Sequence, residues 1–454
     1  MLIIRPVLLP KAIVKSLLVL FVILGITAEN TLTGQTLYFP PTGSQEWDTL
    51  SPSDLGYCDE KIDSLFKYLE DNDSKGFLLL KDGKMVLEKY FGTFTKDSLW
   101  YWASAGKTLT AALVGIAQQE NYLDINDTSS TYLGKGWTSL SPQKEALITI
   151  KDQLSMTSGL DDASGNPDCT FDTCLNYLSD AGSRWAYHNA PYTLLDSVIF
   201  YATNSTINNY LFAKIRNPIG MNGAYVKLGF NNVYFSNMRS MARFGILLLS
   251  QGIWNGNAIF TDSTYFTQMV NSSQNLNLSY GYLTWLNGKN SFMVPQSQIV
   301  FPGTMNPDAP ADMFAAMGKN GQLLNVVPSL GLIWVRMGNP PSSGGGLIGP
   351  VFNNEIWKRI NALPCALGIK TLTLDPDILI YPNPSKGKLR IQATNQASVE
   401  VSIIDSFGRI IQKENLNGPV AELSIAGKVS NGLYILKIEG KGMIHTEKLV
   451  IDKQ

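Results

Sequence analysis

Two pairs of strand-like runs, one at each end of the long central part of the chain, constrain the fold more than any other feature. The first pair flanks Asp82-Gly83 and the second flanks Pro328-Ser329. Apolar runs on both sides of such turn residues are typical of β-hairpins. The sequence between the two pairs is rich in helix-like segments and turn residues. Strands at both ends with helices between them predict one antiparallel sheet that the two ends share. The four runs are residues 76–80, 85–90, 322–327 and 331–336.

The chain divides into three parts around this region. A short leader ends near Asp48, a mixed region spans residues 50–367, and a tail spans residues 371–454. The tail alternates apolar and polar residues in short runs, which is the pattern of a small all-β sandwich. The predicted fold class is therefore α+β, with an antiparallel sheet flanked by helices plus an all-helical region, followed by the sandwich. Helices are expected at residues 58–69, from Ser104 to about Ala117, and at 353–362.

Residues 1–34 have the pattern of an export signal and a short leader. Basic residues precede an apolar run at 16–25, and small residues follow it, so cleavage is expected near Ala28 or Gly34. The run is too short to span a bilayer comfortably, which favours an export signal over the alternative, a membrane anchor. We therefore expect a secreted or cell-surface protein with no stable membrane span.

The four cysteines suit an exported protein with up to two disulfides. Cys169 and Cys174 are close in sequence and are placed to close a small loop. Cys58 and Cys365 lie near the two ends of the central region and are placed to tie those ends together. The alternative is that these residues are free buried thiols.

Charge and histidine content exclude two classes of function. The chain holds 36 Lys and Arg against 37 Asp and Glu, a net charge of −1, so we expect no nucleic-acid partner. It holds two histidines, so we expect neither a His-rich zinc site nor a mechanism that needs several imidazoles.

Ser104 and Lys107 form the first candidate for catalytic chemistry. They precede an Ala-rich apolar run that predicts a buried helix starting near Ser104. Residues three apart share a helix face, so the hydroxyl and the amine can meet. A partly desolvated lysine has a lowered pKa and can accept the serine proton. The alternative is that Ser104 is a helix cap.

Two further segments carry candidate binding residues. Tyr187 and Asn189 are two residues apart and can point to the same side of an extended segment. Tyr187 would then relay a proton, if a nearby lysine lowers its pKa, and Asn189 would hold a substrate carbonyl. Lys319 and Gly321 precede the second hairpin, where a cation and a close backbone approach suit an anionic group of a substrate. The alternatives are an aromatic loop packed on the core and an ordinary strand entry. His188 would point away from the site.

Ser-x-x-Lys, Tyr-x-Asn and Lys-x-Gly in this order resemble the serine β-lactamase and penicillin-binding-protein superfamily. The tyrosine in the second motif is similar to the branch of class C β-lactamases, D-alanyl-D-alanine carboxypeptidases, family VIII carboxylesterases and 6-aminohexanoate-dimer hydrolase. The resemblance covers most of residues 50–360 and implies the β-lactamase/transpeptidase-like fold. Supporting phrases lie at 148–160, 217–221, 241–245 and 280–282.

The resemblance implies an acyl-enzyme mechanism. Ser104 would attack a carbonyl carbon, Lys107 and Tyr187 would share the proton transfers, and backbone N–H groups of Ser104 and Gln322 would form the oxyanion hole. No metal and no organic cofactor are implied. Trp100, Trp102 and Trp185 flank two of the motifs, where they either line an apolar acyl pocket or pack in the core.

The third motif departs from the β-lactamase pattern. Asn320 stands where those enzymes usually have a threonine that helps to hold the β-lactam carboxylate. This favours a small-molecule or peptide-like ester or amide as the substrate over a β-lactam. The alternative is a penicillin-binding or peptidoglycan-recognising protein, D,D-peptidase or β-lactamase-like, with little or no turnover.

The tail resembles a type IX secretion sorting domain of type A. Three phrases carry the resemblance, and they occur in the usual order: 381–387, 401–409 and 431–437. Such a domain implies export across the inner membrane by the signal peptide and across the outer membrane by the type IX machinery, which is then a partner. Removal of the tail afterwards is usual for such domains. The alternative is a carbohydrate-binding or adhesion module.

Overall fold

The computed structural model describes residues 37–163, 165–342, 349–365, 378–393, 398–405, 409–425, 427, 429–440 and 443–453. The export signal expected at 1–34 therefore lies outside the described residues. The described helices and strands fall into two parts with separate hydrophobic cores, a first part at residues 37–365 and a second part at residues 378–453.

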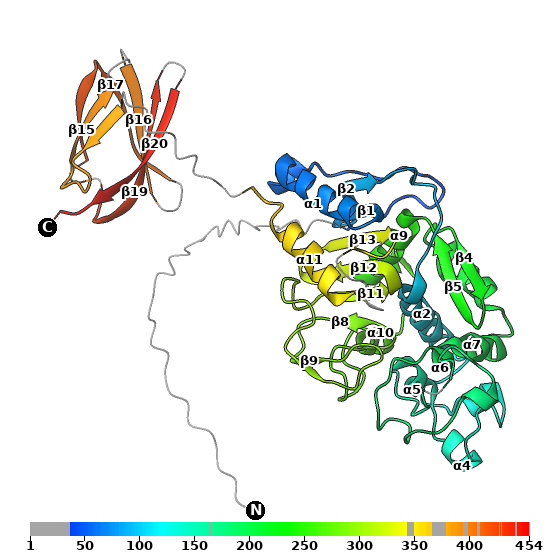
Figure 1. Cartoon of the computed structure of the whole chain (residues 1–454). Helices are drawn as coiled ribbons and strands as arrows, with labels where there is room; N and C mark the ends of the chain where they lie inside the picture. The colour runs from blue at the N-terminus through cyan, green and yellow to red at the C-terminus, as the bar shows by residue number, and fades with distance from the viewer. Residues whose placement is uncertain are drawn as a thin grey trace, which may run out of the picture.

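A six-stranded antiparallel sheet with the strand order β2-β1-β13-β12-β11-β8 forms the centre of the first part (Figure 1). Both predicted hairpins are present in it, as β1–β2 and β12–β13. Because β1 pairs with β13, the two ends of this part lie side by side, which confirms the predicted shared sheet. The strands are β1 (Ser74–Lys81), β2 (Lys84–Tyr90), β8 (Trp285–Leu286), β11 (Phe314–Gly318), β12 (Gln322–Val327) and β13 (Leu332–Gly338).

Helices precede the sheet, fill the chain between its hairpins and follow its last strand. They are α1 (Asp59–Asp71), η2 (Ala103–Ala105), α2 (Gly106–Gln119), α3 (Ser130–Leu133), α4 (Pro142–Glu145), α5 (Ile150–Leu154), α6 (Asn189–Thr193), α7 (Leu195–Thr203), α8 (Ile207–Leu211), α9 (Met238–Leu249), α10 (Ser263–Met269), η5 (Lys319–Gly321) and α11 (Pro350–Asn361). Further strands form smaller sheets: β3 (Trp100–Tyr101), β4 (Ala224–Leu228), β5 (Asn231–Ser236), β6 (Ile253–Trp254), β7 (Asn257–Ala258), β9 (Ser291–Phe292) and β10 (Phe301–Pro302).

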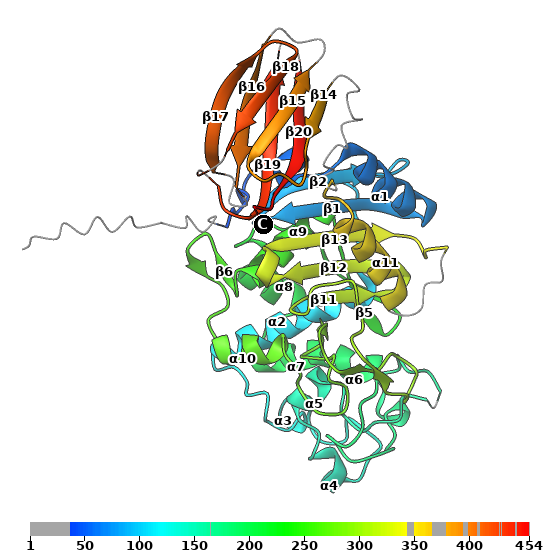
Figure 2. The same cartoon turned by 90° about the vertical axis from the view of Figure 1, so that its left-hand side faces the viewer.

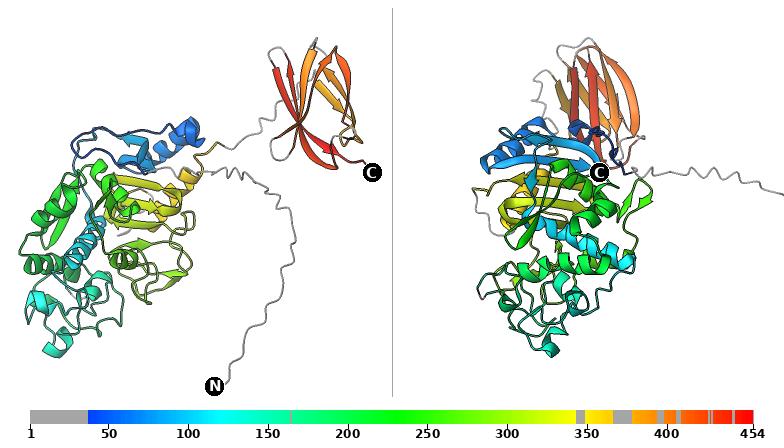
Figure 3. Two further views of the ribbon diagram at one scale, coloured as in Figure 1. Left: turned by 180° about the vertical axis from the view of Figure 1, so that it is seen from behind. Right: turned by 90° about the vertical axis from the view of Figure 1, so that its right-hand side faces the viewer.

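Adjacent residues of β13 face opposite sides of the sheet, as the pleat requires. Ile333 faces α9, which packs closely because a Cβ atom on Gly245 would lie 2.8 Å from the Ile333 side chain. Trp334 faces α11, where its ring centroid lies 6.0 Å from that of Trp357. Figures 2 and 3 show α1 and α11 on one face of the sheet and α9 on the other. The sheet is thus the middle layer of a core that is apolar on both of its faces.

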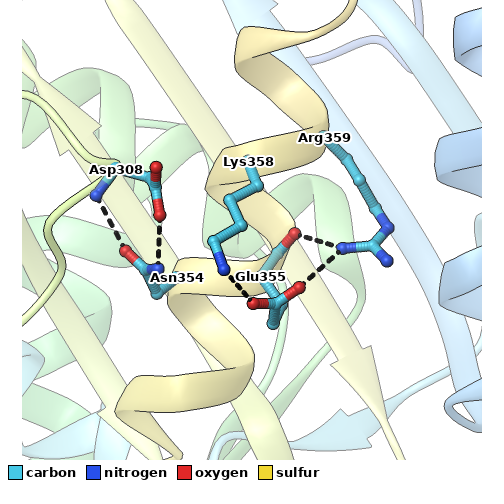
Figure 4. A network of polar contacts seen from close by, with 5 residues as sticks. All are labelled: Asp308, Asn354, Glu355, Lys358 and Arg359. Carbon is cyan, nitrogen blue, oxygen red and sulfur yellow. Dashed lines mark hydrogen bonds and ion pairs between the residues drawn. The ribbon is translucent and has the colours of Figure 1, made fainter.

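Polar contacts hold α11 to the loop that precedes β11 (Figure 4). The N–H of Asp308 donates to Asn354 Oδ1 at 2.9 Å, and Asn354 Nδ2 donates back to Asp308 Oδ2 at 2.6 Å. On the same helix, Glu355 accepts hydrogen bonds from Lys358 and Arg359. Since β11 begins six residues after Asp308, these contacts help to fix the start of that strand.

The structure joins Cys58 to Cys365 and Cys169 to Cys174. Near the first disulfide, the N–H of Cys58 donates to the carbonyl of Leu363 at 3.0 Å. The two ends of the first part, residues 37–365, are therefore linked by the pairing of β1 with β13, by a hydrogen bond and by a disulfide. In the part of the chain that the structure describes, no helix has the length and apolar character needed to cross a bilayer.

The C-terminal strands form two antiparallel sheets, β14-β15-β18 and β17-β16-β19-β20. Both sheets contribute to one hydrophobic core, Leu389 and Leu423 from the first and Val401 and Leu436 from the second. This core is separate from the one around the six-stranded sheet. The strands are β14 (Ile378–Tyr381), β15 (Lys388–Ala393), β16 (Ser398–Ile404), β17 (Ile410–Asn417), β18 (Val420–Ser424), β19 (Gly432–Gly440) and β20 (Met443–Ile451).

Candidate active site

Ser104 lies in η2, the single helical turn between β3 and the start of α2 at Gly106. Ala103, just before it, has φ 47°, a left-handed conformation that costs a residue with a Cβ atom about 1–2 kcal/mol. The neighbouring Trp102 is fully buried and donates to Ser236 Oγ at 2.7 Å, which holds the turn in place. Ser104 caps neither η2 nor α2, so the structure does not support its reading as a helix cap.

Lys107, in the first turn of α2, meets Ser104 as the spacing predicts. Its Nζ donates to Ser104 Oγ at 3.2 Å and lies 4.0 Å from the ring centroid of Tyr192. The side chain is buried, and this burial lowers the pKa of Lys107 to about 7, although Asp168 and Asp196 oppose the shift. A substantial fraction of Lys107 is therefore unprotonated near neutral pH and can accept the serine proton.

Tyr187 approaches the same pair from the loop before α6. Burial raises the pKa of its phenol, and a hydrogen bond with Ser104 lowers it by less. The expectation that a cationic lysine lowers the pKa of Tyr187 does not hold, because burial dominates and also favours the uncharged form of Lys107. Tyr187 is thus a protonated phenol beside the nucleophile, suited to donate a proton.

These side chains surround one cavity of about 360 Å³. The mixed polar lining, with a serine, an amine and a phenol at one point, is suited to acyl transfer. Lys319 contributes an exposed cation at this cavity. The lining residues singled out by the sequence are Ser104, Lys107, Tyr187, Asn189 and Lys319.

Gly321 and Gln322, which the sequence also singled out, do not line this cavity. The Gln322 side chain is buried in the sheet, where its Nε2 donates to the carbonyl of Gly338 at 2.6 Å and its Oε1 accepts from the N–H of Gly338 at 3.1 Å. Gly321 packs against Arg336 and Phe352 with φ 69°. Gln322 pairs with Gly318 at the end of the β11–β12 ladder and does not line the cavity, so the structure does not bring it to the position expected for an oxyanion-hole donor.

Gly318 is the residue that the end of β11 places against the nucleophile. A Cβ atom there would lie 2.5 Å from the carbonyl oxygen of Trp102 and 3.0 Å from the amide nitrogen of Ser104. The backbone at Gly318 and Lys319 thus runs beside the Ser104 amide. Gly318 begins the motif at residues 318–322, but the motif did not predict a contact between Gly318 and Ser104.

Two acidic residues near the lysine were also missed. Asp168 lines the cavity and accepts a hydrogen bond from Asn189 Nδ2 at 2.7 Å. Asp196, on α7, accepts from Asn232 Nδ2, and burial raises its pKa to about 7. No sequence motif marks either residue, apart from the position of Asp168 directly before Cys169.

Trp102, Trp185 and His188, which lie near the motifs in sequence, are buried and do not line the cavity. Trp102 and Trp185 are fully buried, so core packing and not an acyl pocket accounts for them. Trp185 packs against Tyr280 with ring centroids 5.5 Å apart. His188 is buried outside the cavity lining, and this burial lowers its pKa to about 4. Among the described residues, no group of three or more His, Cys, Asp or Glu side chains is placed to hold a metal ion.

Comparison with known families matches two parts of the chain. Residues 76–339, more than half of its length, match the family model described as Beta-lactamase. Residues 379–452 match the model described as Secretion system C-terminal sorting domain, so the tail is a type IX sorting domain. Comparison with curated proteins found no match.

Solved structures share the fold at low sequence identity. A Bacillus anthracis protein assigned as a 6-aminohexanoate-dimer hydrolase is 19% identical with a TM-score of 0.55, covering 72% of this chain and 91% of its own. A penicillin-binding protein homologue from Caulobacter crescentus is 15% identical with a TM-score of 0.52, covering 68% and 98%. A family VIII carboxylesterase is 14% identical with a TM-score of 0.52, covering 67% and 96%. These likenesses extend over nearly the full length of each neighbour and show the β-lactamase/transpeptidase-like fold.

Proposed function

Because this chain belongs to the Beta-lactamase family, we propose that it is an exported serine hydrolase that cleaves an ester or amide bond through an acyl-enzyme on Ser104. The observation that carries the proposal is the hydrogen bond of 3.2 Å between Lys107 Nζ and Ser104 Oγ inside the cavity. A lysine with a pKa of about 7 is matched to general-base work near neutral pH.

The proton transfers follow from the positions of three side chains. Unprotonated Lys107 takes the Ser104 proton as the hydroxyl oxygen attacks the substrate carbonyl carbon. Tyr187 gives its phenol proton to the departing alcohol or amine and regains a proton from Lys107. Water then attacks the carbonyl carbon of the acyl-enzyme and gives a proton to unprotonated Lys107. As the bond between the acyl carbon and Ser104 Oγ breaks, Tyr187 gives its phenol proton to Oγ and regains one from Lys107, so the acid leaves and the free enzyme is restored.

The negative oxygen of the tetrahedral intermediate needs two backbone donors. We place the first at the N–H of Ser104 and the second at the N–H of Lys319, in place of Gln322. The contact between Gly318 and the Ser104 amide supports this placement, because Lys319 is the next residue and lines the cavity.

A substrate panel tests the function. p-Nitrophenyl esters, D-alanyl peptides and a chromogenic cephalosporin are offered to the wild type, to Ser104→Ala and to the matched surface variant Ser263→Ala. We expect turnover of at least one ester or amide by the wild type and Ser263→Ala, and a loss of at least about 10³-fold in Ser104→Ala. The proposal is falsified if Ser104→Ala retains full activity on every substrate that the wild type cleaves.

Adding a fluorescent penicillin to this panel distinguishes the proposed hydrolase from the alternative, a penicillin-recognising protein without turnover. Such a protein would be labelled stably at Ser104 by a fluorescent penicillin and would hydrolyse none of the substrates. The absence of a threonine at Asn320 favours ester or amide hydrolysis over this alternative.

The sorting domain indicates type IX secretion to the cell surface or exterior. We propose that residues 1–34 direct the preceding step across the inner membrane. Deletion of residues 371–454 should then retain the hydrolase inside the cell, and deletion of residues 1–34 should retain it in the cytoplasm. Appearance of either truncated chain in the medium would contradict this route.

A further inference from the structure

A second cavity lies between residues 42–47 of the leader and the start of α9. Its volume is about 210 Å³, and it shares no lining residue with the cavity at Ser104. Among the described residues that line it are two arginines, Arg239 and Arg243, and neither an aspartate nor a glutamate. The charge that a ligand meets in this cavity therefore depends on how the two arginines are neutralised.

Arg243 is a buried cation without a carboxylate partner. It is 5% exposed, and its guanidinium donates to the carbonyls of Pro40 at 3.1 Å, Pro41 at 2.8 Å and Ile219 at 3.0 Å. Burial lowers the pKa of Arg243 to about 10, so the group stays protonated at neutral pH. In the part of the chain that the structure describes, no carboxylate lies close enough to affect this pKa. Carbonyl dipoles thus satisfy the N–H groups but leave the charge without a counter-ion.

Arg239, one helical turn before Arg243, is neutralised within the protein. Its Nε and Nη2 each donate to Glu88 at 2.7 Å, and its Nη1 donates to the carbonyl of Gln45 at 2.6 Å. Since this ion pair cancels, the positive charge of Arg243 remains at the cavity. The N-terminus of α9 adds a partial positive charge beside it.

Two asparagine amides at the cavity present hydrogen-bond donors. Asn237 Oδ1 accepts from the N–H of Ser240 at 2.9 Å, and Asn222 Oδ1 accepts from the N–H of Asn237 at 3.1 Å. Because an N–H faces each oxygen, the Nδ2 atoms point the other way. Both nitrogens keep accessible surface, and neither has an acceptor among the described residues. Asn237 is 3% exposed, so the surface of its nitrogen belongs to the cavity that it lines.

We propose that this cavity binds a small tetrahedral oxyanion of the phosphate class, which accepts hydrogen bonds from the amide nitrogens of Asn222 and Asn237 and offsets the charge of Arg243. Phosphate oxygens are strong acceptors and carry negative charge, which matches free donors beside an uncompensated cation. A cationic ligand would be repelled and would leave both amide nitrogens without an acceptor. The bound ion would connect the leader with α9. The proposal is independent of the hydrolase chemistry, because Ser104 takes no part in it.

Isothermal titration calorimetry of the full chain at pH 7 tests the site. Inorganic phosphate is added at constant ionic strength, and we expect one ion per chain with a Kd of about 1 mM or tighter, against no saturable heat with chloride. Glycerol 3-phosphate is titrated in parallel. Saturable binding of either probe supports the proposal, and the probe that binds tells whether the cavity takes the free ion or a phosphate monoester. Absence of saturable binding by both probes overturns the proposal.

Asn222→Asp tests whether the ion binds in this cavity. The aspartate retains an oxygen for the N–H of Asn237 but places a negative oxygen where the amide nitrogen was. We expect the affinity for phosphate to fall at least about tenfold, because one donor is lost and a like charge is added. Asn121→Asp makes the same change of charge at an exposed asparagine that does not line the cavity, and we expect it to retain the wild-type Kd.

Asn237→Asp provides a second variant should Asn222→Asp fail to fold. Aspartate caps helices as well as asparagine does, so α9 keeps its N-cap bond to Ser240 while the cavity loses a donor. We expect the same loss of phosphate affinity. Phosphate binding that neither aspartate variant weakens overturns the cavity as the site. Because no measurement here involves hydrolysis, failure of the proposed function leaves the outcome of this test unaffected.

Discussion

Replacement of Gly318 by alanine tests how closely β11 must approach the nucleophile. The added Cβ atom would lie 2.5 Å from the carbonyl oxygen of Trp102, 2.9 Å from the amide nitrogen of Ala105 and 3.0 Å from that of Ser104. Cβ atoms essentially never approach within 3.0 Å, so the strand and the turn must separate by at least 3.0 − 2.5 = 0.5 Å. All three neighbours are backbone atoms, so no side chain can rotate to relieve the contact.

This separation moves the backbone at Lys319, one side of the proposed oxyanion hole, relative to Ser104. Displacements of about 1 Å in a catalytic arrangement cost on the order of 10²-fold in rate, which corresponds to about 2.7 kcal/mol. For a shift of at least 0.5 Å, half of that distance, we expect Gly318→Ala to lower kcat/KM on the best p-nitrophenyl ester by about tenfold or more, measured beside Gly43→Ala. A Cβ atom on Gly43 meets no atom within 4 Å, so that control should retain wild-type activity. Gly318→Ala activity within threefold of wild type, with thermal unfolding also unchanged, would refute the reasoning.

Three other perturbations test separate parts of the molecule. The kcat/KM should rise with pH through an apparent pKa of about 7, because Lys107 is protonated below that pH and cannot take the Ser104 proton; a profile that is flat from about pH 5 to 9 would contradict this. Replacing Cys58 and Cys365 together by serine should lower the free energy of unfolding by about 3–5 kcal/mol in urea titrations, since the bond closes a very long loop. A change below about 1 kcal/mol would count against it. Removal of residues 371–454 should leave kcat/KM of the purified protein within about twofold, because the C-terminal strands have a core of their own, and a large loss would argue otherwise.

Local patterns made the sheet predictable. The Asp82-Gly83 pair and the apolar runs around it determine a hairpin within fifteen residues of chain, and the structure contains it. The helical spacing of Ser104 and Lys107 similarly predicted their contact. In each case the deciding interaction joins residues close in sequence, where backbone geometry alone limits the outcome.

The parts that sequence reasoning missed depend on contacts between distant segments. Gly318 meets Ser104 across more than two hundred residues, and its own neighbours in sequence give no sign of that contact. The left-handed turn at Ala103 is stabilised by the burial of Trp102, whereas alanine by itself prefers the right-handed region. Gln322 was assigned by its position after Lys-x-Gly, but it pairs with Gly318 across the β11–β12 ladder and does not line the cavity.

The pairing of β1 with β13 also determines an order of events during biosynthesis. β1 is among the first strands to be made, yet its inner neighbour is the last strand of the sheet. Cys58 likewise cannot form its disulfide until Cys365, 307 residues later, has been synthesised. Contacts between residues so distant in sequence make folding slow. For an exported protein, this delay prolongs the time during which the chain is unfolded and can still cross a membrane as an extended polypeptide. Synthesis of β13 is thus the earliest moment at which the sheet can close.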